Sequence, residues 1–296
     1  MKFTTISRRI AATGAVTAMA AGALVGLTST TATAAPQVTN DYTCSVPGLA
    51  GPYNVTMLTE AVGIEGFPQI NAGADLPAGL LTVTNHVTIP AQAYGLFSQF
   101  GVDNVTFPDM AADFGANKVG VEGMTAKVAD MADNGDGTYG FDAPGSNAAF
   151  QTPVAGEYDI LMPTGFTINA NNAEGTTLAP IVCNLAEGQT AQSLHHIMVV
   201  KNDTVTTGEA TKKQFAVGRK AKVAAAVTGG TQLEGDKVLL KKGTKTLDSA
   251  LLGADGTATL VTNKLPVGKN KLKVVYKATG YNNGSKSDTV IVKVVN

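Results

Sequence analysis

The sequence predicts an all-β protein with two β-sandwich-like modules, the first of which carries one short helix and one disulfide. Three observations support this prediction. Thr, Val, Ala, Asn and Gly dominate the chain, with 33 Gly among 296 residues and no Trp, and this composition favours short strands and many turns over long helices. The two cysteines of the chain bracket its first half. The net charge changes sign near residue 204, which indicates two modules.

The charge distribution sets the expected module borders. Residues 36–203 contain 3 basic and 17 acidic residues, a formal net charge of −14. Residues 204–296 contain 16 basic and 6 acidic residues, a net charge of +10. We therefore expect an acidic module, a linker or domain edge, and a basic module, at 37–190, 191–209 and 210–296. The opposite charges allow either independent modules or modules that dock on each other.

Short runs bounded by Gly, Pro, Asn or Asp predict the strands of the acidic module, at 46–57, 80–89, 118–129, 138–142 and 157–168. Residues 91–100 follow Pro90 and predict a helix, because Tyr94, Phe97 and Phe100 recur on one face at helical spacing. We expect this aromatic face to belong to the core. The Asn-Gly and Asp-Gly pairs of residues 133–138 predict a hairpin turn.

Cys44 and Cys183 are the two cysteines of the chain. In an exported protein, an even number of cysteines without the spacing of a metal site predicts a disulfide, and two free thiols are the alternative. Closing so long a loop stabilises the folded state by about 5 kcal/mol in the chain-entropy model.

Strand alternation is clear in the basic module. Leu272, Val274 and Tyr276 can face one side of a strand while the intervening residues face the other, and Val290, Val292 and Val294 repeat this pattern. Further strands are predicted at 223–227, 238–240 and 257–261. Such runs favour an antiparallel sandwich whose sheets each have one solvated face.

Several segments of the basic module resemble a bacterial immunoglobulin-like repeat. The resemblance covers most of residues 210–296 and rests on the segments 255–260, 265–268, 272–276, 280–282 and 287–295. It implies an immunoglobulin-like sandwich that serves as a spacer, an adhesive stalk or an accessory binding unit of a surface protein.

The acidic module also resembles a known family. It opens with Tyr42-Thr43-Cys44-Ser45 and closes with Val182-Cys183, and in this it is similar to a two-cysteine domain found in secreted actinobacterial proteins. No activity is known for that domain, so the resemblance implies none here.

The N-terminus predicts an export signal. Lys2, Arg8 and Arg9 precede an uncharged run at 10–27, and Ala32-Thr33-Ala34 provides a small-residue cleavage site. We expect residues 1–34 to be removed and the protein to be secreted, extracellular or cell-wall associated, without membrane contact after cleavage. The arginine pair leaves both Sec and twin-arginine export open. An uncleaved anchor is the alternative.

The chain lacks the common catalytic signatures. It contains no Gly-x-Ser-x-Gly elbow, no His-Glu-x-x-His and no phosphate-binding Gly-Lys-Thr loop. We therefore predict no catalytic residue, no cofactor and no metal site. The adjacent His195 and His196 would face opposite sides of a strand and rarely ligate one ion.

Two acidic pairs offer alternatives to this prediction. Calcium near Asp133 and Asp136 is one, although the spacing of an EF-hand is missing. Glu157 and Asp159 could share a strand face as the acid and base of a glycosidase. Because acids are plentiful throughout this module, solvated strand residues are the simpler interpretation.

The lysines of the basic module predict a positive field that would attract anionic cell-wall polymers or acidic polysaccharide. The candidate polyanion-binding residues are Lys212, Lys213, Lys220, Lys222, Lys241, Lys242, Lys245, Lys269, Lys271 and Lys273. Arginine is nearly absent and no aromatic residues interleave with the lysines, so no specific nucleic-acid recognition is expected. A lysine coat that keeps the sandwich soluble is the alternative.

Together these observations predict an exported, non-enzymatic binding or structural protein of the cell exterior. Its immunoglobulin-like module would act as a spacer or as a polyanion-binding or cell-wall-binding unit. One alternative is a carrier of small ligands or lipids, which requires an apolar pocket under the helix 91–100. The other is a secreted hydrolase, which requires convergent carboxylates of raised pKa in a cleft. The sequence makes no prediction of the oligomeric state.

Overall fold

Strands dominate the protein, as the sequence predicts. The structure is a computed structural model that describes residues 35–49, 51–64 and 67–296; the predicted signal peptide, residues 1–34, lies outside this part. The described residues form sheets packed as sandwiches, with one short α-helix and one disulfide, which confirms the predicted all-β class. They enclose two hydrophobic cores, one formed by residues 42–199 and one by residues 221–294.

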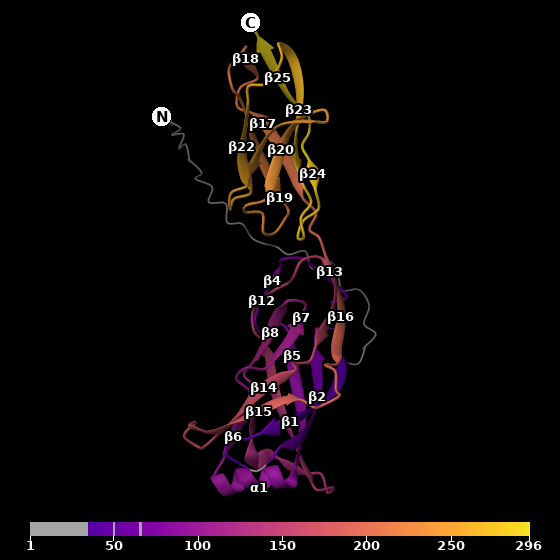
Figure 1. Ribbon diagram of the computed structural model, residues 1–296, viewed down its shortest axis with the longest axis vertical. Helices are drawn as coiled ribbons and strands as arrows, with labels where there is room; N and C mark the ends of the chain where they lie inside the picture. Colours follow the sequence, from indigo (N-terminus) through magenta and orange to yellow (C-terminus); the bar gives the residue numbers. More distant parts are fainter. Residues whose placement is uncertain (1–34, 50, 65–66) are drawn as a thin grey trace, which may run out of the picture. The chain divides into compact units, whose positions relative to one another are not determined.

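A 14-stranded sheet builds the first module (Figure 1). Its neighbours run in the order β3-β16-β13-β7-β8-β11-β5-β2-β1-β15-β14-β6-β9, and β10 pairs with β11. The strands of this sheet are β1 (Gln37–Ser45), β2 (Tyr53–Val62), β3 (Gln69–Asn71), β5 (Thr82–Pro90), β6 (Asn104–Thr106), β7 (Ala111–Phe114), β8 (Asn117–Glu122), β9 (Thr125–Lys127), β10 (Ala132–Asp133), β11 (Thr138–Asn147), β13 (Gly156–Leu161), β14 (Gly165–Asn171), β15 (Thr177–Leu185) and β16 (Ser193–Val200). A separate two-stranded sheet joins β4 (Asp75–Leu76) to β12 (Phe150–Gln151), and the 3₁₀ turn η2 spans Val128–Asp130.

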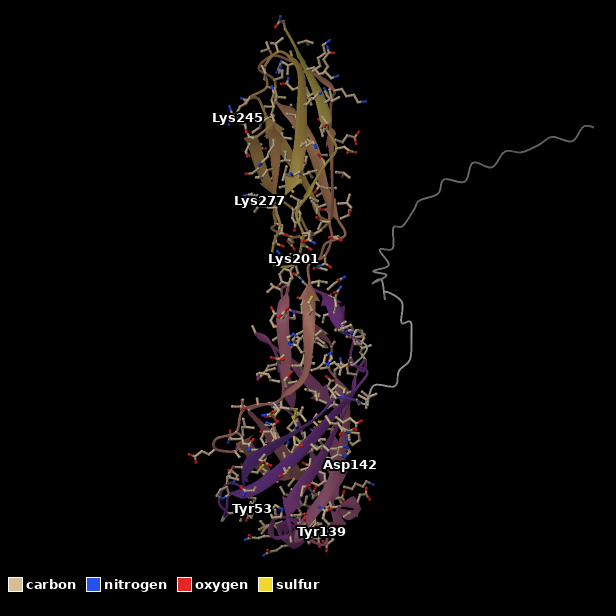
Figure 2. All side chains as sticks on the ribbon, turned by 90° about the vertical axis from the view of Figure 1, so that its right-hand side faces the viewer. Tyr53, Tyr139, Asp142, Lys201, Lys245 and Lys277 are labelled. Carbon is tan, nitrogen blue, oxygen red and sulfur yellow. A yellow bond between two sulfur atoms is a disulfide. The ribbon has the colours of Figure 1, made fainter. Side chains whose placement is uncertain are left out.

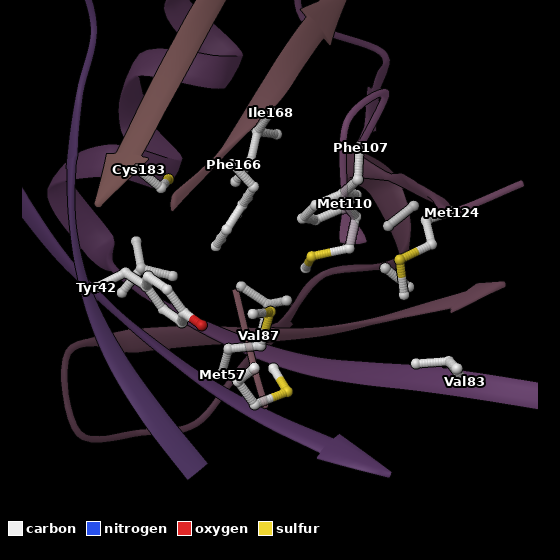
Figure 3. Close-up of a cluster of buried hydrophobic side chains, with 14 of the residues drawn as sticks. Tyr42, Met57, Val83, Val87, Phe107, Met110, Met124, Phe166, Ile168 and Cys183 are labelled. Atoms are coloured by element: carbon white, nitrogen blue, oxygen red, sulfur yellow. The ribbon is translucent and has the colours of Figure 1, made fainter. Parts of the chain in front are cut away.

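The core of this module follows from the two-residue period of its central strands. Every second residue of β2 is buried from Tyr53 to Ala61, as expected where one face of a sheet covers a core. Tyr42 of β1 meets Phe166 of β14 edge to face, with ring centroids 4.9 Å apart (Figure 3). The Tyr42 hydroxyl donates a hydrogen bond to the Pro163 carbonyl over 2.9 Å, and burial raises the pKa of this hydroxyl.

Helix α1 (Ala91–Phe100) has the predicted bounds. Pro90 precedes it, and Gly101 ends it in the left-handed region with φ of +67°, a conformation that glycine adopts without strain. Phe97 is buried, and Tyr94 stacks on Tyr139 with the two ring centroids 3.8 Å apart. Phe100, in contrast, is 51% exposed. The predicted core face therefore holds for the first two aromatic residues only. In the described part of the chain, no helix has the length and apolarity needed to cross a membrane.

Three predicted strands are each wrong as single elements. Residues 118–129 are divided among β8, β9 and the 3₁₀ turn η2. Residues 46–57 contain a turn before β2 begins at Tyr53, and the preceding strand β1 was not predicted. Residues 157–168 are divided between β13 and β14 at Pro163. Pro52 and Pro163 lie in the last two of these breaks, and proline lacks the amide hydrogen that donates to a ladder.

Two sheets form the second module. One has the order β17-β19-β22, and the other has the order β18-β25-β23-β20-β21, with β24 paired to β23. The strands are β17 (Val205–Ala210), β18 (Gln214–Ala216), β19 (Ala221–Thr228), β20 (Lys237–Lys242), β21 (Lys245–Leu251), β22 (Thr257–Thr262), β23 (Gly268–Tyr276), β24 (Ser285–Lys286) and β25 (Val290–Val295). Leu272, Val274 and Tyr276 are buried, which confirms the predicted alternation. The residues 191–209, predicted as a linker or domain edge, contain β16 of the first sheet and all but the last residue of β17 in the second module.

The predicted disulfide is present. Cys44 of β1 and Cys183 of β15 lie directly opposite each other in an antiparallel pair, with an S–S distance of 2.04 Å. Both cysteines are buried in the first core. The bond joins strands from the two ends of the module, because its cysteines are 139 residues apart in sequence.

Reduction of this disulfide should lower the melting temperature of the first module and leave that of the second unchanged. Reduction restores about 5 kcal/mol of chain entropy to the unfolded first module in the chain-entropy model, and the second core contains no cysteine. Calorimetry of the purified chain with and without a thiol reductant measures both transitions. A first transition that does not move on reduction would contradict this stabilising role.

The substitution Gly256→Val should destabilise the second module and thereby identify its transition. Gly256 has φ of +72°, and an added Cβ would lie 2.6 Å from the Val227 carbonyl oxygen. Gly137 is the matched control, because it occupies the same Asp-Gly-Thr turn sequence in the first module at φ of +87° with open space around it. Gly137→Val should cost only the left-handed strain of about 1–2 kcal/mol, and Gly256→Val should cost more in chemical denaturation. Equal losses would show that the contact with Val227 is unimportant.

Candidate functional site

The outer face of one sheet in the second module carries a group of lysines. Lys269, Lys271 and Lys273 alternate along β23 with buried residues, so all three point away from the core. On the neighbouring strands, Lys293 of β25 lies directly opposite Lys269, and Lys241 of β20 lies directly opposite Lys273. We call these five side chains the lysine face.

The five side chains of the lysine face place their positive charges close together. They repeat about every 7 Å along β23, and adjacent strands lie about 5 Å apart. Beside them on the same face, Ile291 lies opposite Lys271 and Leu239 opposite Val275. The neighbours of Lys293 on β18 and of Lys241 on β21 are the uncharged polar residues Gln214 and Thr246. Within residues 35–49, 51–64 and 67–296, every ion pair lies in the first module. The lysine face therefore carries no carboxylate that neutralises it.

The other predicted lysines lie elsewhere on the second module. Lys212 and Lys213 lie in the turn between β17 and β18, whereas Lys220 precedes β19 and Lys222 is exposed on it, in the opposite sheet. Lys242 and Lys245 pair at the β20–β21 hairpin; Lys245 and Lys277 extend from this module in Figure 2. The Lys242 ammonium donates a hydrogen bond to Oδ1 of buried Asn270 over 2.6 Å. This lysine therefore makes a structural contact within the module. The structure thus brings four of the ten predicted lysines together.

Sequence reasoning missed Lys293. The signal was present, because Val290, Val292 and Val294 were predicted to face the core and Lys293 therefore had to face outward. What the sequence lacked was the register of β25 against β23, which places Lys293 opposite Lys269.

An apolar cavity of about 360 Å³ lies between α1 and the strands of the first module. Helix α1 contributes Ala93 and Phe97, and β1, β2, β5, β6, β11, β14 and β15 contribute further side chains. Cys44 of the disulfide forms part of the wall. The carrier hypothesis required a pocket under this helix, and the structure contains one there. Tyr53, which lines the cavity, lies with Tyr139 at the helix end of the module (Figure 2).

Large apolar side chains stay exposed where the cavity meets solvent. Leu49, Phe100 and Leu178 line the cavity and are 38%, 51% and 45% exposed, respectively. Exposed apolar groups of this kind make the rim a candidate contact surface for an apolar ligand.

Of the two carboxylates considered for catalysis, Asp159 is held by neighbouring side chains. Asp159 accepts one hydrogen bond from the Ser193 hydroxyl, and its Oδ1 lies 3.1 Å from Nδ1 of His196. The His196 interaction, followed by the Ser193 hydrogen bond, lowers the pKa of Asp159. A glycosidase acid requires a raised pKa, so Asp159 does not fit that role. Glu157 is exposed on the same strand.

In the acidic turn at 133–138, the carboxylates of Asp133 and Asp136 accept hydrogen bonds from residues of the turn itself. Asp133 accepts a hydrogen bond from the Gly135 amide at 2.8 Å, and Asp136 accepts from both the amide and the hydroxyl of Thr138. The hydroxyl of Thr138, then its amide, lowers the pKa of Asp136. This is the pattern of the predicted turn.

The histidines are distributed over the first module. His86 Nδ1 lies 2.7 Å from Asp142 Oδ1. His196 and His195 occupy adjacent positions of β16, opposite Asp159 and Ile160. In the part of the chain that the structure describes, no three His, Cys, Asp or Glu side chains group as metal ligands.

Residues 205–295 match the family model of the bacterial Ig-like domain (group 3). The resemblance of the basic module to a bacterial immunoglobulin-like repeat is thereby confirmed. The resemblance of the first module to the two-cysteine domain stays a prediction. No curated protein matches the chain.

Three solved structures are similar to the chain at low identity. A protein of Corynebacterium diphtheriae described as membrane anchored has 15% identity and a TM-score of 0.40, over 88% of this chain and 59% of that one. The adhesin FdeC of Escherichia coli has 16% identity and a TM-score of 0.25, over 83% of this chain and 66% of that one. Fibronectin(III)-like modules of Clostridium thermocellum CbhA have 12% identity and a TM-score of 0.25, over 85% of this chain and 94% of that one. Because these TM-scores are low, we draw no functional argument from them.

The like-charge pairs of the lysine face should cost the second module stability. Lys293→Glu would place a carboxylate opposite Lys269 and should stabilise the module by about 0.5 kcal/mol, an effect that shrinks in high salt. Lys264→Glu, at an exposed position outside the strands, is the control with the same change of charge. Chemical denaturation of both variants measures the difference. Equal stability changes would mean that net charge, rather than the pairing, sets the effect.

Proposed function

We propose that this chain is an exported, non-enzymatic binding protein of the cell exterior, and that its immunoglobulin-like module binds an anionic cell-wall polymer through the lysine face. The observation that carries the proposal is the pairing of Lys269 with Lys293 and of Lys241 with Lys273 across adjacent strands. The predicted export signal at residues 1–34 supports the location.

The electrostatics of the face favour an anionic partner. Like charges directly opposite each other on a sheet oppose folding, and no carboxylate on this face relieves them. A bound anion would neutralise both members of a pair at once. The attraction would be long-ranged at low salt and would weaken as salt screens it.

The shape and composition of the face favour a polymer over other anions. Its lysines are spread over three strands and do not converge on one point, so several can contact a chain of repeated charges. Arginine, which recognises phosphate through two parallel hydrogen bonds, is absent from the face. Aromatic side chains that would stack on nucleic-acid bases are also absent from it. A cell-wall polymer or acidic polysaccharide fits these properties.

The experiment is sedimentation of the purified chain with isolated Gram-positive cell-wall sacculi across a sodium chloride series. Binding should be strong at low salt, should fade as salt rises, and should disappear when the anionic polymers have been removed from the sacculi. Binding to stripped sacculi, or no binding at low salt, would contradict the proposal and leave the module as a spacer.

Two triple variants with the same change of charge separate the lysine face from the overall charge. The face variant is Lys269→Gln, Lys271→Gln and Lys273→Gln, and the control variant is Lys212→Gln, Lys213→Gln and Lys222→Gln. All six lysines are exposed, so both variants should fold. The face variant should release from sacculi at lower salt than the control. Equal losses would assign binding to the net charge of the module and not to this face.

A further inference from the structure

We propose that the cavity beneath α1 is a second binding site, which takes the acyl chain of a single-chain amphiphile such as a fatty acid. This site lies in the first module and is independent of the lysine face. The proposal rests on the size of the cavity, the chemistry of its walls and the apolar residues at its rim.

The cavity is large and apolar. Its volume of about 360 Å³ lies within the range of about 300–1,000 Å³ typical of small-molecule sites. Val55, Ile89, Phe97 and Ile181 illustrate its lining. A cavity with such walls offers water few partners, so an apolar ligand gains by replacing solvent there.

The walls determine which part of a ligand can enter. No side chain that lines the cavity is charged or carries an amide, and the hydroxyl of Tyr53 is the one side-chain oxygen among them. Burying a charged or strongly polar head group without partners is costly. The ligand must therefore insert an apolar tail and keep its head group outside.

The rim supports an amphiphile of this kind. Leu49, Phe100 and Leu178 line the cavity and are partly exposed, so the tail can continue against apolar surface as it leaves the cavity. Helix α1 carries no charged residue. Binding should therefore depend on the tail and change little when the head group changes.

Selection by the tail has a measurable consequence. Each methylene group added inside the cavity should strengthen binding by about fourfold, until the tail fills the available length. Octanoate, decanoate and laurate should therefore form a series of rising affinity. The methyl ester of laurate should bind about as well as laurate, because its head group stays in solvent.

The absence of Trp from the chain provides a direct measurement. Phe100→Trp places a single fluorescent indole at the exposed rim, where substitution disturbs little packing. In the purified, delipidated chain, palmitate brominated along its tail should quench this Trp saturably, and unlabelled palmitate should reverse the quenching. Thr257→Trp, at an exposed position of β22 in the second module, is the control and should not be quenched saturably. Equal quenching of both would overturn the proposal.

Filling the cavity tests the site itself. Ala93→Phe puts a large side chain into the cavity, and Ala91→Phe makes the same change at an exposed position of the same helix that does not line it. Palmitate should raise the melting temperature of the first module in the native chain and in Ala91→Phe, but not in Ala93→Phe. If Ala93→Phe fails to fold, Ala179→Phe, which fills the cavity from β15, takes its place. Stabilisation that persists in the filled variant, or that is absent from the native chain, would refute the acyl-chain site.

Vesicles of neutral phospholipid distinguish a free amphiphile from a membrane surface. If the site serves free fatty acids, the native chain should remain in the supernatant when the vesicles are sedimented. Co-sedimentation that the Ala93→Phe substitution leaves unchanged would show that the exposed rim, and not the cavity, contacts lipid, and would overturn the proposal.

Discussion

In the first module, β1 pairs with β2 on one side and with β15 on the other, and the Cys44–Cys183 bond links the second of these pairs. The pairing joins the start of the module to its end, and such long-range closure carries a large entropic cost. Tyr42 of β1 packs on Phe166 within the same arrangement. The wall of the α1 cavity contains Cys44, so the disulfide that secures the fold also shapes the cavity.

The second module depends on the two-residue period of its strands. One set of alternate residues on β23 and β25 fills the core, and the other set is exposed or half-buried. On β20 three successive residues, Val238 to Leu240, are buried. Once register fixes Lys269 opposite Lys293 and Lys241 opposite Lys273, charge accumulates on the outer face. The buried Leu, Val and Tyr side chains of the core stabilise the module and oppose this electrostatic cost. The proposed polyanion would bind to the positive charge of this outer face.

The two proposals assign different chemistry to the two modules. The lysine face offers long-range, salt-sensitive attraction spread over three strands, which suits a large partner. The cavity offers short-range apolar contact in an enclosed space, which suits a small one. A chain with both could be held at a charged wall while its first module binds an amphiphile.

The sequence by itself determined the strand class, helix 91–100 and the disulfide, because composition, helical spacing and cysteine count are local or whole-chain properties. The immunoglobulin-like module was recognised from the resemblance of its segments to a known family, which the family model over residues 205–295 confirms. It also determined which residues of β23 face outward, since alternation needs no partner strand. Only the tertiary structure decided that Lys293 joins Lys269, because register depends on pairing with another strand. The same holds for the cavity: Phe97 and Phe100 looked like core, and packing of α1 against β5 and β11 left space beneath them. Cavities arise from how distant surfaces fail to fill the space between them, and no periodicity within one segment records that.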